Sequence, residues 1–182
     1  MLEEIYKVLA NPINAIVLGW LLIYLFVVFF VFFYKFFSLA SWIRKEEEAL
    51  NSLMLSKVLP VSSSLKNCIE RMENINKLGF DACIKAAKKK AKSYLVVLSI
   101  IASTSPFIGL FGTVVGILNA FNGMKSVTTL NMIAPSIAEA LIATAVGIIV
   151  AVPAYTFHQI LASKVENLIE TLKIERDLFL SK

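Results

Sequence analysis

The chain has 182 residues, of which 58% are hydrophobic and only 17% are charged, and its mean hydropathy is +0.75. These values exclude a water-soluble domain of this size, because such domains carry about 25% charged residues. The formal net charge is +5, and its distribution along the chain is more informative than its sum.

Three runs are free of Asp, Glu, Lys and Arg, or nearly so. They cover Val8–Tyr34, Ser93–Met124 and Ser126–Ser163, and the third is interrupted only by Glu139. Each run exceeds the roughly 20 apolar residues that a helix needs to cross a bilayer. The sequence therefore predicts an all-α protein with three transmembrane helices and long cytoplasmic helical extensions.

The charges give these helices a direction. Eleven basic residues lie between Ser41 and Lys92, whereas the turn after the second span has only Lys125. Positive residues concentrate on the cytoplasmic side, so the N-terminus is predicted outside and the C-terminus inside. In chain order we predict an outer N-terminal segment at 1–14, transmembrane helix 1 at 15–39, a cytoplasmic helical loop at 40–92, transmembrane helix 2 at 93–122, a short outer turn at 123–131, transmembrane helix 3 at 132–161 and a cytoplasmic C-terminal helix at 162–182.

The basic loop allows a nucleic-acid-binding interpretation, which its position disfavours. Lys88, Lys89 and Lys90 come directly before a membrane entry, where lysines meet anionic headgroups. The bilayer is therefore the expected partner, with no nucleic acid. Cys68 and Cys83 have no His or Cys neighbours at metal-ligand spacing, so we expect reduced, free thiols, no metal and no cofactor.

The first span is bulky and aromatic on every face, as in a helix that faces lipid, and no site is assigned to it. In the cytoplasmic loop, Pro60 and the serines after it break a helix, and Ser64 is the expected N-cap of the next one. Residues 79–81 mark a further boundary. A helix from about Asp81 is expected to run unbroken into the second span.

The second and third spans are rich in small residues, which let helix backbones approach closely in lipid. Two such helices beside one bulky helix suggest an inner and an outer ring in an oligomer. The glycines expected to pack helices are Gly109, Gly112, Gly116 and Gly147, and the prolines expected to kink them are Pro106, Pro135 and Pro153. Hydroxyls at 103–105 are expected to satisfy backbone groups that Pro106 frees.

Glu139 is the expected centre of function. An ionisable group at bilayer depth costs at least about 2.5 to 3.5 kcal/mol and usually marks an ion or proton path. Glu139 falls about two turns inside the third span, roughly 10 Å deep. The alternative is a protonated side chain that only hydrogen-bonds across helices.

Thr144 and Thr113 lie at comparable depths in the third and second spans. Their hydroxyls suit a polar lumen, although a membrane threonine often bonds only the carbonyl four residues back. The sequence contains no phosphate-binding Gly-rich loop with its lysine, no Cys/His metal spacing and no Ser/His/Asp constellation. We therefore do not expect an enzyme.

Two blocks of sequence carry a family resemblance. Thr104-Ser105-Pro106-Phe107-Ile108-Gly109-Leu110-Phe111-Gly112-Thr113-Val114-Val115-Gly116-Ile117, followed by the block from Ile133 to Gly147, resembles the second and third spans of the TolQ/ExbB family, relatives of the flagellar MotA stators. The likeness is collinear over Thr104–Pro153, and the three-span topology extends it to nearly the whole chain.

The resemblance implies a homopentamer in the bacterial inner membrane, with its outer side in the periplasm. The second and third helices would surround a lumen that holds two single-span helices of a TolR/ExbD-type partner bearing a membrane aspartate. Proton flow past that aspartate would energise a TolA- or TonB-type protein acting on the outer membrane, in Tol-Pal envelope integrity or TonB-dependent uptake.

The family roles fall on three residues. Thr113 and Thr144 correspond to lumen-lining hydroxyls and Glu139 to the lumen carboxylate, while Val115 stands where the family often has tryptophan. The proton path is the same in Tol and Exb systems, and the short N-terminal segment slightly favours the Tol type. Two alternatives stay open: a MotA-type stator subunit, which the absence of a fourth span disfavours, and a structural membrane scaffold without proton conduction.

Overall fold

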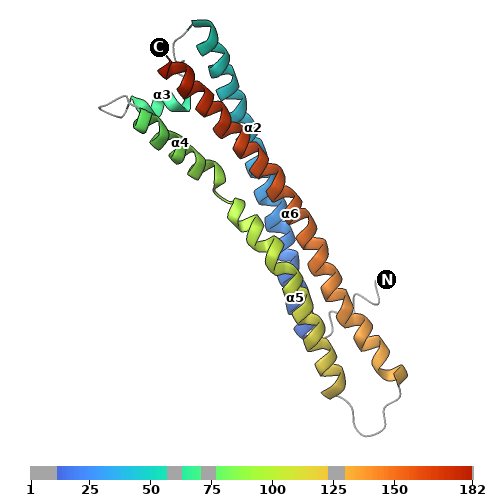
Figure 1. Ribbon diagram of the computed structural model, residues 1–182. Coiled ribbons are helices and arrows are strands. Elements are labelled where there is room, and N and C mark those ends of the chain that lie inside the picture. The colour runs from blue at the N-terminus through green and yellow to red at the C-terminus, as the bar shows by residue number, and fades with distance from the viewer. Residues whose placement is uncertain (1–11, 57–62, 71–76, 123–129, 182) are drawn as a thin grey trace. The chain divides into compact units, whose positions relative to one another are not determined.

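The computed structural model describes residues 12–56, 63–70, 77–122 and 130–181 (Figure 1). Within these residues all regular structure is helical, in α2 (Pro12–Ser56), α3 (Ser64–Ile69), α4 (Lys77–Lys92), α5 (Leu95–Asn122) and α6 (Leu130–Leu180). Helices α2, α5 and α6 are long and apolar enough to cross a membrane. The predicted all-α, three-span fold is confirmed. Most of the predicted segments 1–14 and 123–131, with Lys125, lie outside the described residues.

Two of the membrane helices are longer than the spans predicted for them. Helix α2 has 45 residues and α6 has 51, which correspond to about 67 and 76 Å at 1.5 Å per residue. A hydrocarbon core is about 30 Å thick. Each helix therefore continues well beyond the bilayer as one uninterrupted element.

The chain divides into two compact units. The first, here called the membrane unit, consists of the chain up to Val31 and Val97–Phe157; the second, here called the extension unit, consists of Phe32–Val96 and His158–Lys182. Helices α2 and α6 contribute residues to both.

In the membrane unit, the buried face of α6 consists mostly of small residues. On α6 the buried residues recur every three or four positions, at Ala140, Ala143, Gly147, Val150 and Ala154. That spacing keeps them on one helix face. Large aromatic side chains are exposed instead: Phe26 and Phe107 are each 71% exposed. Aromatic surface of this kind is tolerated when lipid or another subunit covers it.

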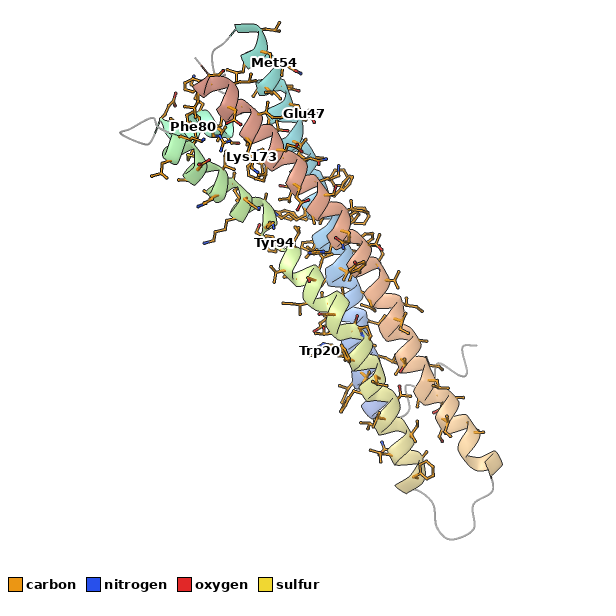
Figure 2. All side chains as sticks on the ribbon, viewed as in Figure 1. Trp20, Glu47, Met54, Phe80, Tyr94 and Lys173 are labelled. Atoms are coloured by element: carbon orange, nitrogen blue, oxygen red, sulfur yellow. A yellow bond between two sulfur atoms is a disulfide. The ribbon has the colours of Figure 1, made fainter. Side chains whose placement is uncertain are left out.

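The extension unit has a core of its own. Leu161, Val165, Leu168 and Leu172 continue the buried face of α6. Phe80 of α4, labelled in Figure 2, packs against Phe179 of α6 with ring centroids 5.5 Å apart. The guanidinium of Arg176 also pairs with the carboxylate of Asp81.

The prediction of two free thiols is wrong. Cys68 of α3 and Cys83 of α4 form a disulfide, with their Cα atoms 6.0 Å apart. Helices α3 and α4 pack against each other, and this packing brings together two cysteines that are 15 residues apart in the sequence. The positions of the two cysteines along the chain do not indicate that packing.

The expected unbroken helix into the second span is also wrong. Helix α4 ends at Lys92 and α5 begins at Leu95, and between them Tyr94 has a φ of 70°. Lys35 of α2 donates hydrogen bonds to the Lys90 carbonyl, at 3.2 Å, and to Ser93 Oγ, at 3.0 Å. These hydrogen bonds stabilise the C-terminal end of α4 at a position where the local sequence contains no helix-stop signal. The boundary expected at 79–81 lies inside α4.

The N-cap of α3 is Ser63, one residue before the predicted Ser64. Ser63 Oγ accepts a hydrogen bond from the Leu65 amide at 3.2 Å and donates one to Glu175 Oε2 at 3.0 Å. Both serines could cap a helix. Ser63 is the cap in the structure because its hydroxyl also bonds Glu175, which lies on α6, far along the sequence.

Candidate functional site

Two of the predicted polar residues meet where α5 contacts α6. Thr113 is only 7% exposed, and its hydroxyl donates to the Gly109 carbonyl at 3.1 Å. The Oγ1 atoms of Thr113 and Thr144, 31 positions apart, are also hydrogen-bonded. A hydroxyl has a single proton. Since Thr113 uses its proton on Gly109, Thr144 is the donor in the bond between the two threonines.

Glycines allow the close helix contact around this pair. A Cβ atom at Gly109 would lie 2.7 Å from the Ala143 carbonyl oxygen, and one at Gly147 would lie 2.7 Å from the Ser105 carbonyl oxygen. Real Cβ atoms essentially never approach backbone that closely, so the two helices could not keep this spacing with alanine at either position. The absence of side chains therefore sets how close α5 and α6 can come.

Gly112 makes a similar contact with two neighbours. A Cβ atom there would lie 2.9 Å from Ala143 Cβ and 3.1 Å from Val17 Cγ1, so this glycine faces both α6 and α2. Gly116, one turn further along α5, is buried. Small residues thus line the side of α5 that faces the other two helices.

Glu139 lies apart from the threonines in a single chain. Its side chain is partly exposed, five residues before Thr144 on α6. Five residues turn a helix by about 140° beyond a full turn, so the two side chains flank the buried face from opposite sides. Among the described residues, Glu139 makes no hydrogen bond and no ion pair. Its carboxylate is available to water or to another chain.

The hydroxyls before Pro106 do not act as predicted. Ser103 Oγ and Thr104 Oγ1 donate to the Ile100 carbonyl at 3.0 and 2.8 Å, whereas the carbonyl that Pro106 leaves without a helical donor belongs to Ala102. Ser105 is fully buried, and its hydroxyl has no partner among the described residues.

The three prolines predicted to kink helices lie inside helices that run continuously past them. Pro106 lies within α5, and Pro135 and Pro153 lie within α6.

Sequence reasoning missed two buried carboxyl groups in the extension unit. Glu46 of α2 and Glu175 of α6 are both 0% exposed. Glu46 accepts hydrogen bonds from Trp42 Nε1 at 2.9 Å and from the Ser64 amide at 3.1 Å. Glu175 accepts from Ser63, and its Oε1 has no partner in the described chain.

The surroundings of Glu175 favour its neutral form. Burial raises the pKa of Glu175 to about 7, the nearby Glu46 carboxylate adds to this, and the hydrogen bond from Ser63 opposes it. A signal in the sequence could have revealed this burial. Glu175 follows Leu168 and Leu172 at the spacing of the buried face of α6, and a carboxyl group in phase with leucines is expected in the interior.

Residues 46–174 match the family described as the MotA/TolQ/ExbB proton channel family. The chain belongs to this family. The resemblance to TolQ and ExbB is thereby confirmed, and the MotA/TolQ/ExbB assignment makes the chain a multi-pass protein of the inner membrane with a proton-channel energiser role.

The relatives of this chain include both TolQ and ExbB proteins, which are here called the two branches. The ExbB-like protein 1 of Helicobacter pylori is 38% identical over 176 residues, which cover 93% of this chain and 92% of the relative. The Tol-Pal system protein TolQ of Pseudomonas aeruginosa is 46% identical over 88 residues, which cover 47% of this chain and 38% of TolQ. The biopolymer transport protein ExbB of Salmonella typhimurium is 47% identical over 77 residues, 41% of this chain and 32% of ExbB. These identities favour neither branch.

Proposed function

We propose that five copies of this chain surround a central lumen lined by α5 and α6, and that the lumen holds single-span helices of a TolR/ExbD-type partner. Protons driven by the proton-motive force pass through it, and the motion that results energises a TolA- or TonB-type protein acting on the outer membrane. The observation that supports this best is the hydrogen-bonded Thr113–Thr144 pair between α5 and α6. Glu139, five residues before Thr144 on α6, is the one charged residue in spans that are otherwise uncharged.

Each polar residue has a role in the proposal. Glu139 exchanges protons with water in the lumen, because its carboxylate has no partner in the described chain. Thr113 and Thr144 present hydroxyl oxygens to the partner's membrane carboxyl group. The rest of the path is apolar, so conduction requires the partner to complete the polar route and does not leak without it.

The exposed side of α5 supports assembly. Its side chains Phe107, Leu110, Phe111, Val114 and Leu118 are each 49 to 71% exposed, on the side away from the glycines that contact α6. A neighbouring copy of the chain would cover this surface.

The energetics require several protons per work cycle. One elementary charge moving through 100 mV releases about 2.3 kcal/mol. This free energy changes an equilibrium constant by less than about a hundredfold. Repeated passage through one defined path is therefore needed to do work on a distant protein.

Replacing the carboxyl group tests the proposal. Glu139→Gln keeps the size and polarity of the side chain and removes the exchangeable proton. We expect proton flux in vesicles that contain the chain and its co-purified partner to fall at least tenfold, with an unchanged oligomer mass. Glu166→Gln, an exposed change on α6, is the control and should leave the flux unchanged.

The same experiment separates the alternatives. A structural scaffold would lose assembly in Glu139→Gln, and full proton flux in that variant would refute the assigned role of Glu139. The partner that co-purifies with the chain distinguishes a TolR/ExbD-type energiser from a MotA-type stator.

A further inference from the structure

A cavity lies in the extension unit at the break between α4 and α5. It has a volume of about 210 Å³ and is bordered by Tyr34, Lys35 and Trp42 of α2, by Lys90 of α4, and by Ser93 and Tyr94 of the break. Trp42 and Lys90 also border a second cavity of about 360 Å³ beside the Cys68–Cys83 disulfide. Figure 2 labels Tyr94 at this break.

The cavity holds a buried ammonium group that lacks a counter-charge from this chain. Lys35 is only 7% exposed, and its two hydrogen bonds, to Lys90 O and Ser93 Oγ, use two of its three N–H donors. Among the described residues no carboxylate pairs with Lys35 or with Lys90. A buried charge without a counter-charge is costly, and an anion in the cavity would remove that cost.

Aromatic rings hold both cations at the cavity. Lys90 Nζ lies 5.5 Å from the Trp42 ring centroid, and Lys35 Nζ lies 5.8 Å from that of Tyr94. Tyr94 itself has the positive φ that costs free energy for a non-glycine residue. The fold thus maintains an unfavourable backbone conformation at the place where it gathers two lysines.

The position along the chain indicates which anion the cavity meets. Lys35 directly follows the first charge-free run, which ends at Tyr34, and the second such run starts at Ser93. The cavity therefore lies where apolar spans give way to charged sequence, the level at which lysines meet lipid phosphates.

We propose that the cavity between Lys35, Lys90, Trp42 and Tyr94 binds a phosphate group. The group belongs to an anionic lipid headgroup or to a free phosphate ion, and the ammonium groups of the two lysines are its ligands. This site is distinct from the proton path through Glu139 and does not depend on it.

The test compares two lysines on the same helix. Lys90→Gln removes one ligand and keeps the backbone carbonyl that Lys35 bonds. Lys88→Gln removes the same charge from an exposed position outside the cavity. Native mass spectrometry of the detergent-solubilised oligomer counts retained phosphatidylglycerol against phosphatidylcholine. We expect Lys90→Gln to weaken phosphatidylglycerol retention about fivefold, the effect of one lysine charge near an anionic surface, and Lys88→Gln to have little effect.

A second measurement identifies the source of the phosphate. Trp42 is the only tryptophan left in a Trp20→Phe variant, so its emission reports on the cavity. An emission change with short-chain phosphatidylglycerol but not with inorganic phosphate indicates a headgroup site, and the same change with inorganic phosphate indicates a free-ion site. The proposal is overturned if Lys90→Gln and Lys88→Gln lose equal amounts of lipid and inorganic phosphate leaves the emission unchanged.

Discussion

Glu175 occupies a position on α6 where the preceding turns bury leucine and valine. It is fully buried, one oxygen accepts a hydrogen bond from Ser63, and the other has no partner in the described chain. The same Ser63 hydroxyl caps α3. The protonation of one carboxyl group therefore bears directly on the contact between α6 and the start of α3.

The raised pKa of Glu175 predicts how stability depends on pH. Between pH 4.5 and about 7 the folded state keeps a proton that the unfolded state has lost. The free energy of unfolding therefore falls as pH rises through this window, by up to about 3 kcal/mol, and is level above it. Thermal unfolding from pH 4.5 to 8 measures this fall. The Glu175→Gln variant should lose most of this pH dependence of the free energy of unfolding, and the Glu166→Gln variant should keep it. An unchanged pH dependence in Glu175→Gln would assign the effect to another group.

The close approach of α5 and α6 also depends on single residues. Gly109→Ala places a Cβ 2.7 Å from the Ala143 carbonyl oxygen, so the helices must separate, at a cost of about 1 to 3 kcal/mol. We expect a lower unfolding midpoint in detergent. Gly19→Ala is the matched control, because its added Cβ meets nothing within 4 Å and alanine favours helix. Equal midpoints for the two variants would contradict the packing described for Gly109.

At the scale of helices, the features that depend on local sequence pattern were predicted, and the features that depend on contacts with residues far along the chain were not. The charge-free runs predict α2, α5 and α6, and the small residues predict the side on which α5 and α6 meet. The break at Tyr94 was missed because it depends on Lys35, 58 positions from Ser93. The disulfide was missed for a similar reason, since it follows from the packing of α3 on α4. Periodicity could have revealed Glu175.

The disulfide between α3 and α4 predicts a redox-dependent stability of the extension unit. Opening a closed loop of about 15 residues costs about 3 kcal/mol in the chain-entropy account. Reductant should therefore speed amide hydrogen exchange in α3 and α4, and the double variant Cys68→Ser/Cys83→Ser should exchange fast with or without reductant. Equal exchange in the reduced and oxidised wild-type chain would show that the bond adds nothing to stability.

At the scale of the whole molecule, the family assignment rests on a match over residues 46–174. That range takes in the end of α2, all of α3, α4 and α5, and most of α6. The sequence predicted this family from two blocks within α5 and α6. The proximity of Glu46 to Glu175 was not predicted, because these two buried residues lie on α2 and α6, far apart in the sequence.

The orientation of the chain is testable by labelling. In a Cys68→Ser/Cys83→Ser background, a membrane-impermeant maleimide added to spheroplasts should label Lys125→Cys in the predicted outer turn. It should leave Glu170→Cys unlabelled until the cells are lysed, because the basic loop and the C-terminal helix are predicted to be cytoplasmic. The reverse labelling pattern would invert the proposed topology.

The hydrogen bonds of the two threonines restrict what they can offer to a third group. Thr113 commits its proton to Gly109, and Thr144 commits its proton to Thr113. The pair therefore presents only lone pairs outward, which receive a hydrogen bond from a protonated acid or a water molecule but give none to an ionised carboxylate. An acidic side chain docked here is thus best accommodated in its uncharged form, and giving up its proton would weaken its hold on this subunit.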